Sequence, residues 1–311
     1  MQPVRPSMRT EVTVIVNASS GSAEGRDTEE RVREAFRAAG AEARVHSAES
    51  GEEIVELARR AASDGSATVV AGGGDGTVSS VAAAVAGSEK EFGVLPLGTL
   101  NHFAKDLGIP EDLALAARTI VEGESTLVDV GEVNGRVFLN NSSIGLYPRI
   151  VKHREDQQER LGWGKWPALV WATIHALHRH RPLDVILSVD GKEIRRRTAF
   201  VFVGNNVYDM EGFDIGTRAC LDGGELSIYL SRAEHPFGLL VLAFRALFGL
   251  LKGATGFETL RTAELTIETR AREIRVATDG EVSMVETPLK YKVRPRSLRV
   301  VRPRPAETAA P

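Results

Sequence analysis

A glycine-rich stretch that contains one acid, residues 72–77 (GGGDGT), is the part of this sequence best suited to chemistry. An apolar run precedes it and an Ala- and Val-rich run follows it, so a strand, a tight turn and a helix are expected. Glycine has no Cβ and adopts positive φ easily, so backbone N–H groups in this turn can approach a bulky anion. Thr77 is placed to cap the helix, whose positive end then faces the same spot. The expected ligand is a phosphate chain, bound by Gly72, Gly73, Gly74, Gly76 and Thr77.

Asp75 distinguishes this stretch from a simple phosphate cradle. A carboxylate beside phosphates is unfavourable unless a divalent cation balances the charge, so Asp75 indicates a complex of magnesium with a nucleotide. A Rossmann dinucleotide site fits less well, because no acidic residue ends a second strand about 20 residues further on. The sequence contains no G-x-x-x-x-G-K-[ST], which excludes a P-loop. A plain turn between strand and helix is the alternative interpretation.

Two more loops follow predicted strands. A small polar loop, residues 18–22, comes after the strand at 10–17, and a second turn, residues 98–101, comes after the strand at 92–97. Ligands of open α/β sheets collect beyond the carboxyl ends of the strands, so these loops and the glycine-rich stretch are expected to converge on one crevice. The further candidates for nucleotide binding are Asn17, Ser20, Gly21, Gly98, Thr99 and Asn101.

A pair of acids, Asp279 and Glu281, flanks Gly280 at the end of another predicted strand. Asp-Gly is a favoured hairpin dipeptide, so a simple turn is one interpretation. Phosphoryl transfer, however, needs a group that accepts the proton of the acceptor hydroxyl. If the fold brings these acids to a cleft that contains Asp75, one carboxylate can serve that hydroxyl while the other holds the cation or orients the first.

The first 125 residues alternate strand and helix patterns. Ser50 and Glu53 form an S-x-x-E capping box at the start of one of the helices. The order predicts an α/β domain, residues 1–125, with a parallel sheet covered on both faces. Strands are expected at 10–17, 41–47, 67–71 and 92–97, and helices at 27–39, 50–65, 77–87 and 110–123.

Beyond residue 125 the pattern changes to strands with tight turns. Asn134-Gly135 and Asp190-Gly191 predict hairpins, the second of which joins strands at 183–189 and 192–203. We therefore expect a mainly antiparallel β domain over residues 126–302 and a frayed tail at 303–311. Further strands are expected at 226–230, 265–267, 274–276 and 289–294, and helices near 163–181 and 236–252.

Composition and charge exclude several classes of protein. With 26% charged residues and a formal net charge of −3, the chain has no electrostatic reason to bind nucleic acid. No apolar run is long enough to span a membrane, and the apolar segment 236–251 is expected to be either a buried helix or one that contacts a membrane. The single cysteine, Cys220, cannot form an internal disulfide, is compatible with a reducing cytoplasm and is expected to be buried. His175, His178 and His180 lack a Cys or carboxylate at zinc spacing, so a solvated basic helix end is expected there.

Three motifs in order carry a family resemblance: residues 73–77 (GGDGT), residues 96–105 (PLGTLNHFAK) and residues 279–281 (DGE). Together they resemble the diacylglycerol kinase catalytic-domain family, which includes bacterial soluble lipid kinases and sphingosine kinases, from about Thr10 to Pro303. The resemblance implies a phosphofructokinase- and NAD kinase-like α/β N-terminal domain, an antiparallel β-sandwich C-terminal domain, and a nucleotide site in the cleft between them. It implies an ATP- and Mg²⁺-dependent lipid kinase in which the glycine run binds the ATP phosphates. Asp279 would be the general base, with Glu281 beside it.

The sequence departs from the family pattern at three positions. The first loop has Ala18 where the family has proline, and the second motif has His102 where the family commonly has aspartate. The family's structural magnesium loop resembles residues 221–226 (LDGGEL), but one acidic position is Gly223. By this resemblance Asp222 is the candidate metal ligand.

Several alternatives stay open at this stage. An NAD kinase-like phosphotransferase shares residues 73–77 and a β-rich second domain, but it does not need the apolar helix at 236–251. A catalytically inactive lipid or nucleotide sensor fits His102 and Gly223. The expected partners are a lipid substrate and a transient membrane surface, in the cytoplasm or peripherally at the membrane. The acceptor lipid, with diacylglycerol, phosphatidylglycerol and sphingoid bases as candidates, and the oligomeric state, with a homodimer as one option, are not fixed.

Overall fold

The computed structural model describes residues 9–18, 25–145, 182–208, 218, 220–231 and 257–304. Ser20, Gly21, the three histidines, the helices expected at 163–181 and 236–252, and the tail beyond residue 304 lie outside the described residues. The chain forms two compact units, unit 1 with residues 1–128 and 296–311 and unit 2 with residues 129–295. The boundary predicted from the sequence lies between residues 125 and 126, with residues 296–302 in the second domain.

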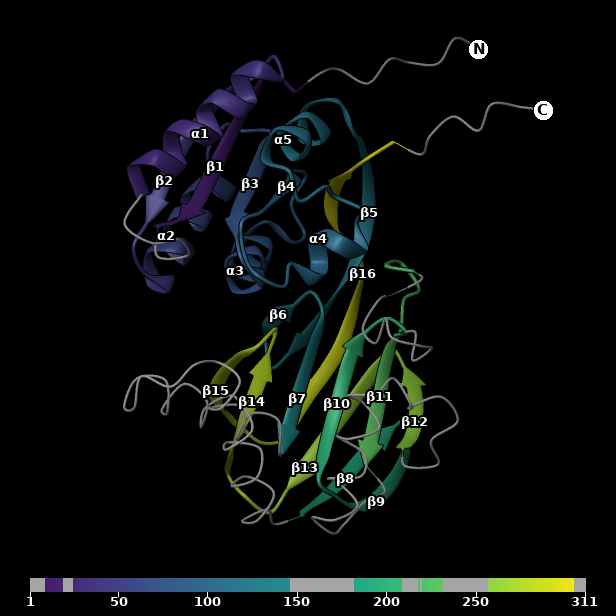
Figure 1. Cartoon of the computed structure of the whole chain (residues 1–311). Helices are drawn as coiled ribbons and strands as arrows, with labels where there is room; N and C mark the ends of the chain where they lie inside the picture. Colours follow the sequence, from purple (N-terminus) through teal and green to yellow (C-terminus); the bar gives the residue numbers. More distant parts are fainter. Residues whose placement is uncertain are drawn as a thin grey trace, which may run out of the picture. The chain divides into compact units, whose positions relative to one another are not determined.

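Unit 1 is an α/β layer structure built on a parallel sheet, as predicted (Figure 1). The strand order is β2-β1-β3-β4-β16, in which Arg299 and Val300 of β16 lie opposite Glu91 and Phe92 of β4. The strands are β1 (Glu11–Asn17), β2 (Glu42–Ala48), β3 (Thr68–Gly73), β4 (Glu91–Pro96) and β16 (Leu289–Arg302). The helices are α1 (Gly25–Ala38), α2 (Gly51–Ser63), α3 (Asp75–Val85), α4 (His102–Asp106) and α5 (Leu113–Glu122).

The burial pattern explains why this sheet forms. Every residue of β3 is buried, and the apolar residues of β1 and β4 are buried as well, as a sheet covered on both faces requires. Helix α1 packs with α5, and α2 packs with α3, so the helices form two pairs. The chain runs through α1 from β1 to β2, and in the opposite direction through α2 to β3 and through α3 to β4. Right-handed crossovers therefore place α1 on one face of the sheet and the pair α2 and α3 on the other. Half of the capping box is confirmed, because Ser50 Oγ accepts a hydrogen bond from Glu53 N at 3.2 Å. The Glu53 carboxylate accepts from Glu49 N at 2.8 Å, one residue before the N-cap.

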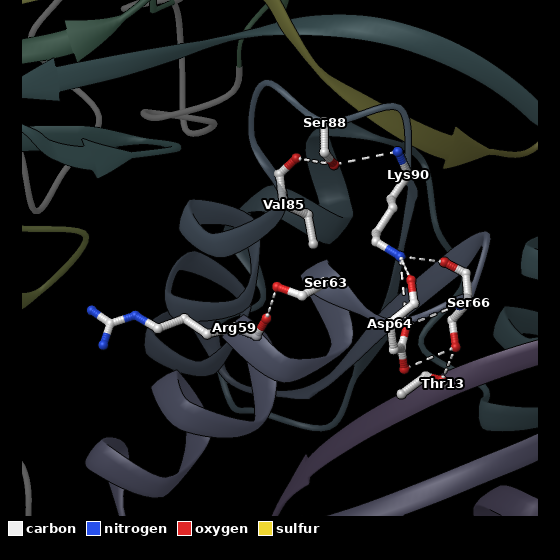
Figure 2. A network of polar contacts seen from close by, with 8 residues as sticks. All are labelled: Thr13, Arg59, Ser63, Asp64, Ser66, Val85, Ser88 and Lys90. Atoms are coloured by element: carbon white, nitrogen blue, oxygen red, sulfur yellow. Dashed lines mark hydrogen bonds and ion pairs between the residues drawn. The ribbon is translucent and has the colours of Figure 1, made fainter.

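A polar network joins the amino ends of the central strands (Figure 2). Lys90 Nζ donates to the carbonyl oxygens of Asp64 at 2.7 Å and Ser66 at 2.6 Å, and the Lys90 side chain is only 13% exposed. Ser66 Oγ also contacts Thr13 Oγ1 at 2.5 Å. Lys90 therefore ties the start of β4 to the loop that enters β3, and Ser66 ties that loop to β1.

The Lys90→Met substitution is expected to lower the free energy of unfolding by about 1–3 kcal/mol, because two carbonyl groups lose their hydrogen bonds to a charged donor. At about 2–4 °C per kcal/mol, the Tm falls by several degrees in a thermal scan. Arg59→Met is the matched control, because the exposed Arg59 side chain points away from this network in Figure 2. Equal Tm values for the two variants would contradict a stabilising role for Lys90.

Unit 2 is an antiparallel β-sandwich (Figure 1). One sheet has the order β12-β11-β10-β7-β14-β15, and the other pairs the start of β16 with β13, β8 and β9. Apolar side chains of both sheets form one core that includes Phe138, Ile144, Leu187, Ile228 and Leu289. The strands are β5 (Glu124–Val133), β6 (Arg136–Phe138), β7 (Asn141–Gly145), β8 (Leu183–Val189), β9 (Lys192–Thr198), β10 (Phe200–Asn205), β11 (Leu226–Ser231), β12 (Phe257–Thr262), β13 (Glu264–Thr269), β14 (Glu273–Thr278) and β15 (Glu281–Glu286).

Both predicted hairpins are confirmed. Asn134, Gly135, Asp190 and Gly191 all have positive φ, as a type I′ turn requires, and they join β5 to β6 and β8 to β9. The single strand expected at 192–203 is wrong. It divides at Ala199 into β9 and β10, which belong to different sheets, and Thr198 Oγ1 donates to the Phe200 and Ser231 carbonyl oxygens beside the break.

No helix within the described ranges combines the length and the apolar character needed to cross a membrane.

Candidate active site

The glycine-rich stretch forms the turn between β3 and α3, as predicted, but its glycines serve close packing rather than positive φ. None of Gly72, Gly73, Gly74, Gly76 and Gly98 has positive φ. A Cβ on Gly72 would lie 2.6 Å from Val16 Cγ1, and a Cβ on Gly73 would lie 2.6 Å from Thr77 Oγ1. The capacity of glycine for positive φ is therefore not used in this turn, whereas the absence of a Cβ is required at Gly72 and Gly73.

The prediction that Thr77 caps α3 is also wrong. The N-cap residue is Gly74, which has no side chain to offer, and Thr77 lies buried in the first helical turn. Its hydroxyl accepts from Asn17 Nδ2 at 3.4 Å, which links the end of β1 to this turn. Among the described residues no acceptor bonds the first-turn N–H groups of Asp75, Gly76 and Thr77. These groups form the positive end of an eleven-residue helix.

The turn after β4 is held in place by Asn101, which has a φ of 51° and is 7% exposed. Asn101 Oδ1 accepts from Gly98 N at 3.0 Å, and Asn101 Nδ2 donates to the Gly98 carbonyl at 2.9 Å. A Cβ on Gly98 would overlap Gly74 Cα, so the turns after β3 and β4 are in direct contact. Thr99 is exposed beside them. Unit 1 thus brings together the predicted residues of three strand ends, Asn17, Gly72–Thr77 and Gly98–Asn101, while Ser20 and Gly21 are outside the described part of the chain.

Asp75 is the first residue of α3 and is half-buried. Within the part of the chain that the structure describes, its carboxylate has neither a hydrogen-bond partner nor an ion-pair partner. The positive end of the helix stabilises a negative charge at this position. The Asp75 carboxylate is therefore available to coordinate a cation bound to phosphates.

Asp279 lies in unit 2, in the turn between β14 and β15, and its φ of 48° together with the positive φ of Gly280 makes this a hairpin turn. Three backbone amides of residues 139–141, between β6 and the start of β7, bind the Asp279 carboxylate. Leu139 N donates to Oδ2 at 2.7 Å, and Asn140 N and Asn141 N donate to Oδ1 at 2.8 and 3.0 Å. Asp279 N in return donates to the Asn141 carbonyl at 2.9 Å. Such charge-assisted bonds fix the orientation of the carboxylate.

Glu281 follows two residues later, at the start of β15. Partial burial of its carboxyl group and then the negative charge of Asp279 raise the pKa of Glu281. The residue as a whole is exposed, so we expect the raised pKa to have a small effect on stability. For an acid whose folded-state pKa is raised, the contribution to stability is complete below the unfolded-state pKa and is lost as the pH rises through the folded-state pKa.

Glu281→Gln is therefore expected to raise the Tm at pH 7 by about 1–2 °C, because the charge that Asp279 repels is removed. The difference between variant and wild type should disappear as the pH falls below the ordinary pKa of a glutamate, about 4.3, because the Glu281 carboxyl group is then uncharged in both the folded and the unfolded state. Glu286→Gln, at the other end of β15, is the control for a carboxylate on the same strand. A thermal-unfolding series from pH 4 to pH 8 measures the effect, and a Tm below that of the wild type at pH 7 would contradict it.

The sequence analysis missed a set of buried polar residues in unit 2. Asp129 is 1% exposed, and its carboxylate accepts from Gly224 N at 2.7 Å. Asn206 Oδ1 accepts from Gly223 N at 2.9 Å, and a Cβ on Gly223 would lie 2.8 Å from that oxygen. These contacts hold the loop 220–225, and they explain why glycine occupies position 223. The adjacent pair Asn205-Asn206, at the end of β10, is the signal that could have drawn attention to this site.

Cys220 is exposed, so the expectation that it is buried was wrong. A backbone hydrogen bond at Asp222 lowers the pKa of the thiol, but partial burial and the negative charges of Asp222 and Asp129 outweigh it, and the pKa is raised. The thiol is therefore neutral at pH 7 and a poor nucleophile. Asp222 itself is exposed and accepts from Cys220 Sγ at 3.2 Å.

A metal cage made only of protein side chains does not occur in the described ranges, where no group of three or more His, Cys, Asp or Glu residues converges. Magnesium does not need such a cage when one carboxylate and substrate phosphates hold it. Asp75 fits that mode of binding, whereas Asp222 as a metal ligand stays a prediction. His102, at the position where an aspartate was expected, is exposed at the start of α4.

Comparison with known proteins connects this geometry to a family. Residues 11–133 match the diacylglycerol kinase catalytic domain, and residues 150–302 match the YegS C-terminal NAD kinase beta sandwich-like domain. A diacylglycerol kinase of Bacillus subtilis (strain 168) is 35% identical over 241 residues, which are 76% of this chain and 78% of that protein. A probable lipid kinase YegS-like protein of Cronobacter sakazakii is 43% identical over 187 residues, 56% of this chain and 60% of that protein.

A crystal structure of a diacylglycerol kinase from Bacillus anthracis str. Sterne superimposes with a TM-score of 0.69 at 21% identity, covering 97% of this chain and 99% of that one. At this identity the likeness supports the fold alone. The two family models and the Bacillus subtilis relative together cover both units. The chain belongs to the diacylglycerol kinase family of lipid kinases.

Proposed function

We propose that this protein transfers the γ-phosphate of Mg·ATP to the hydroxyl group of a lipid. Two features formed by the predicted motifs support this proposal, an anion-binding helix end in unit 1 and an oriented carboxylate in unit 2. Unit 1 presents the open N-terminus of α3 with Asp75 at its first position, and unit 2 presents a carboxylate, Asp279, that three backbone amides orient. Phosphoryl transfer needs these two parts, an anion-binding end with a cation and an oriented group beside the nucleophile.

In unit 1, the first-turn amides of α3 and the contacting turn at Gly98 would bind the phosphates of ATP. Asn17 and Asn101 would keep the two turns in place, since their side chains bond Thr77 and Gly98. Asp75 would hold Mg²⁺, which when bound neutralises part of the negative charge of the phosphates. Thr99, exposed in the turn after β4, would add a donor. Ser20 and Gly21 stay candidates from the sequence alone.

In unit 2, Asp279 would accept the proton of the lipid hydroxyl as that oxygen forms its bond to the γ-phosphorus and ADP leaves. Glu281 would assist by orienting Asp279, as the sequence predicts. We propose that both units contact the same nucleotide. A lipid acceptor also requires at least transient contact with a membrane surface, and we propose a cytoplasmic protein that binds the membrane peripherally.

The test offers ATP labelled in the γ-phosphate to the purified full-length protein together with a panel of acceptors. The panel contains vesicles of total membrane lipids, diacylglycerol, phosphatidylglycerol and a sphingoid base, with NAD in a separate arm. We expect label in a chloroform-soluble product that requires Mg²⁺. Label in NADP alone would replace the proposal with an NAD kinase activity, which the match of unit 2 to an NAD kinase-like domain makes worth testing. ATP binding without transfer to any acceptor would indicate an inactive sensor.

A further inference from the structure

The segment Leu139–Asn141, here called the platform, has a second set of partners behind the face that binds Asp279. The Leu139 carbonyl accepts from Arg218 Nη1 at 2.6 Å and from Asn205 Nδ2 at 2.9 Å. The Asn140 carbonyl accepts from Asn205 N at 2.9 Å. The amides of the platform thus bind the candidate base, while its carbonyl groups are bound by donors on the other side.

Arg218 is the charged member of this second set, and it is only 6% exposed. Burying a guanidinium group is costly unless hydrogen bonds satisfy it. Arg218 Nη1 also donates to the Asn205 carbonyl at 3.2 Å, and Nη2 donates to Asn140 Oδ1 at 2.8 Å. The guanidinium carbon lies 5.6 Å from the centre of the Tyr208 ring. The planar guanidinium group therefore bonds the backbone of Leu139 and the side chain of Asn140 at the same time, a geometry that a lysine cannot reproduce.

The link from Arg218 to Asp279 passes through one peptide group. Arg218 bonds the carbonyl oxygen of Leu139, and the amide of the same peptide group, Asn140 N, donates to Asp279 Oδ1 at 2.8 Å. A cation on the carbonyl side polarises the peptide and strengthens its N–H as a donor, because hydrogen bonds in a chain reinforce one another in a low dielectric. The same contact also keeps the three platform amides aligned for the carboxylate.

We infer that Arg218 is a positioning residue for the Asp279 carboxylate and acts on the reaction only through the platform. The inference rests on the proposed function. A purely structural role would make Arg218 variants unstable without a specific effect on turnover. A positioning role predicts a loss of kcat that disappears once Asp279 no longer acts as the base.

The experiment compares Arg218→Lys and Arg218→Met in the full-length protein, alone and combined with Asp279→Asn. Asn134→Ala is the matched control, since the Asn134 side chain bonds the Glu286 and Pro288 carbonyl oxygens of the same unit and lies outside the platform. We measure kcat, the KM for ATP, and Tm for each protein with the lipid acceptor found for the wild type. Should the Met variant fail to fold, the Lys variant with its retained charge decides the question by the same measurements.

We expect Arg218→Lys to lower kcat by about 10–100-fold, because small misplacements of a catalytic group have effects of that size. Its KM for ATP should stay within about twofold, and the extra loss in the Asp279→Asn background should be no more than about threefold. A kcat equal to that of Asn134→Ala, or a full extra loss in that background, overturns the inference while the proposed function stands. A wild type that phosphorylates no lipid, or a fully active Asp279→Asn, overturns the proposed function and this inference with it.

Discussion

The Asp279→Asn enzyme is expected to lose lipid phosphorylation by about 10²–10⁴-fold, the usual contribution of a positioned general base. The asparagine side chain has nearly the same shape, but it cannot take the proton from a hydroxyl group. The Kd for ATP should change little, because the proposed phosphate site is built by residues of unit 1. Steady-state transfer from labelled ATP measures the first quantity, and titration calorimetry with ATP measures the second.

This substitution also has a predictable effect on stability. The structure shows three amide donors around a group that would offer only one acceptor oxygen after the change. At least one N–H then faces the new NH₂ group, so we expect a loss of about 1–3 kcal/mol in the free energy of unfolding. Activities must therefore be compared well below the Tm of the variant. A folded variant with more than about a third of wild-type activity would remove Asp279 from the role of base.

The second large effect is expected for Gly98→Ala. Its Cβ would overlap Gly74 Cα and lie 2.9 Å from Asn101 Oδ1, so the clash involves backbone that no side-chain rotation can relieve. The turns after β3 and β4 must separate, at a cost of about 1–3 kcal/mol. Because both turns are assigned to the phosphate site, the Kd for ATP should rise by at least about tenfold.

Gly65→Ala is the control for Gly98→Ala, since a Cβ there would meet no atom within 4 Å. Its free energy of unfolding should stay within about 0.5 kcal/mol of the wild-type value. Chemical denaturation and ATP titration of the two variants test this pair. Wild-type ATP affinity in Gly98→Ala would show that the contact between the turns has no part in nucleotide binding.

Local patterns were sufficient to predict most of the fold. The alternation of strands and helices in unit 1 could be predicted, because strands such as β3 are completely buried and therefore appear as mostly apolar runs in the sequence. The hairpins at Asn134-Gly135 and Asp190-Gly191 were readable because few residues tolerate positive φ. The division at Ala199 was not readable, because no turn residue marks it and the two halves differ only in the sheet that they join.

The candidate site was predictable only in part, for a similar reason. The motifs identified the turns, but they did not show that Gly98 contacts Gly74 or that Gly74 is the N-cap of α3. The contact between the platform and Asp279 could not be predicted, because backbone amides have no sequence signature and Leu139 is 140 residues away from Asp279 along the chain. Arg218 is 79 residues from Leu139, and only the three-dimensional fold brings them together.

In the proposed mechanism, unit 1 binds the nucleotide and unit 2 accepts the proton of the lipid hydroxyl. The most direct test measures the Kd for ATP and the single-turnover rate of transfer to lipid for the wild type, Gly98→Ala and Asp279→Asn. The account predicts that Gly98→Ala raises the Kd, and that Asp279→Asn leaves the Kd within about twofold while the rate falls by at least about 10². An Asp279→Asn enzyme that transfers phosphate at the wild-type rate, or one whose loss of rate is explained entirely by a weaker Kd for ATP, would contradict it.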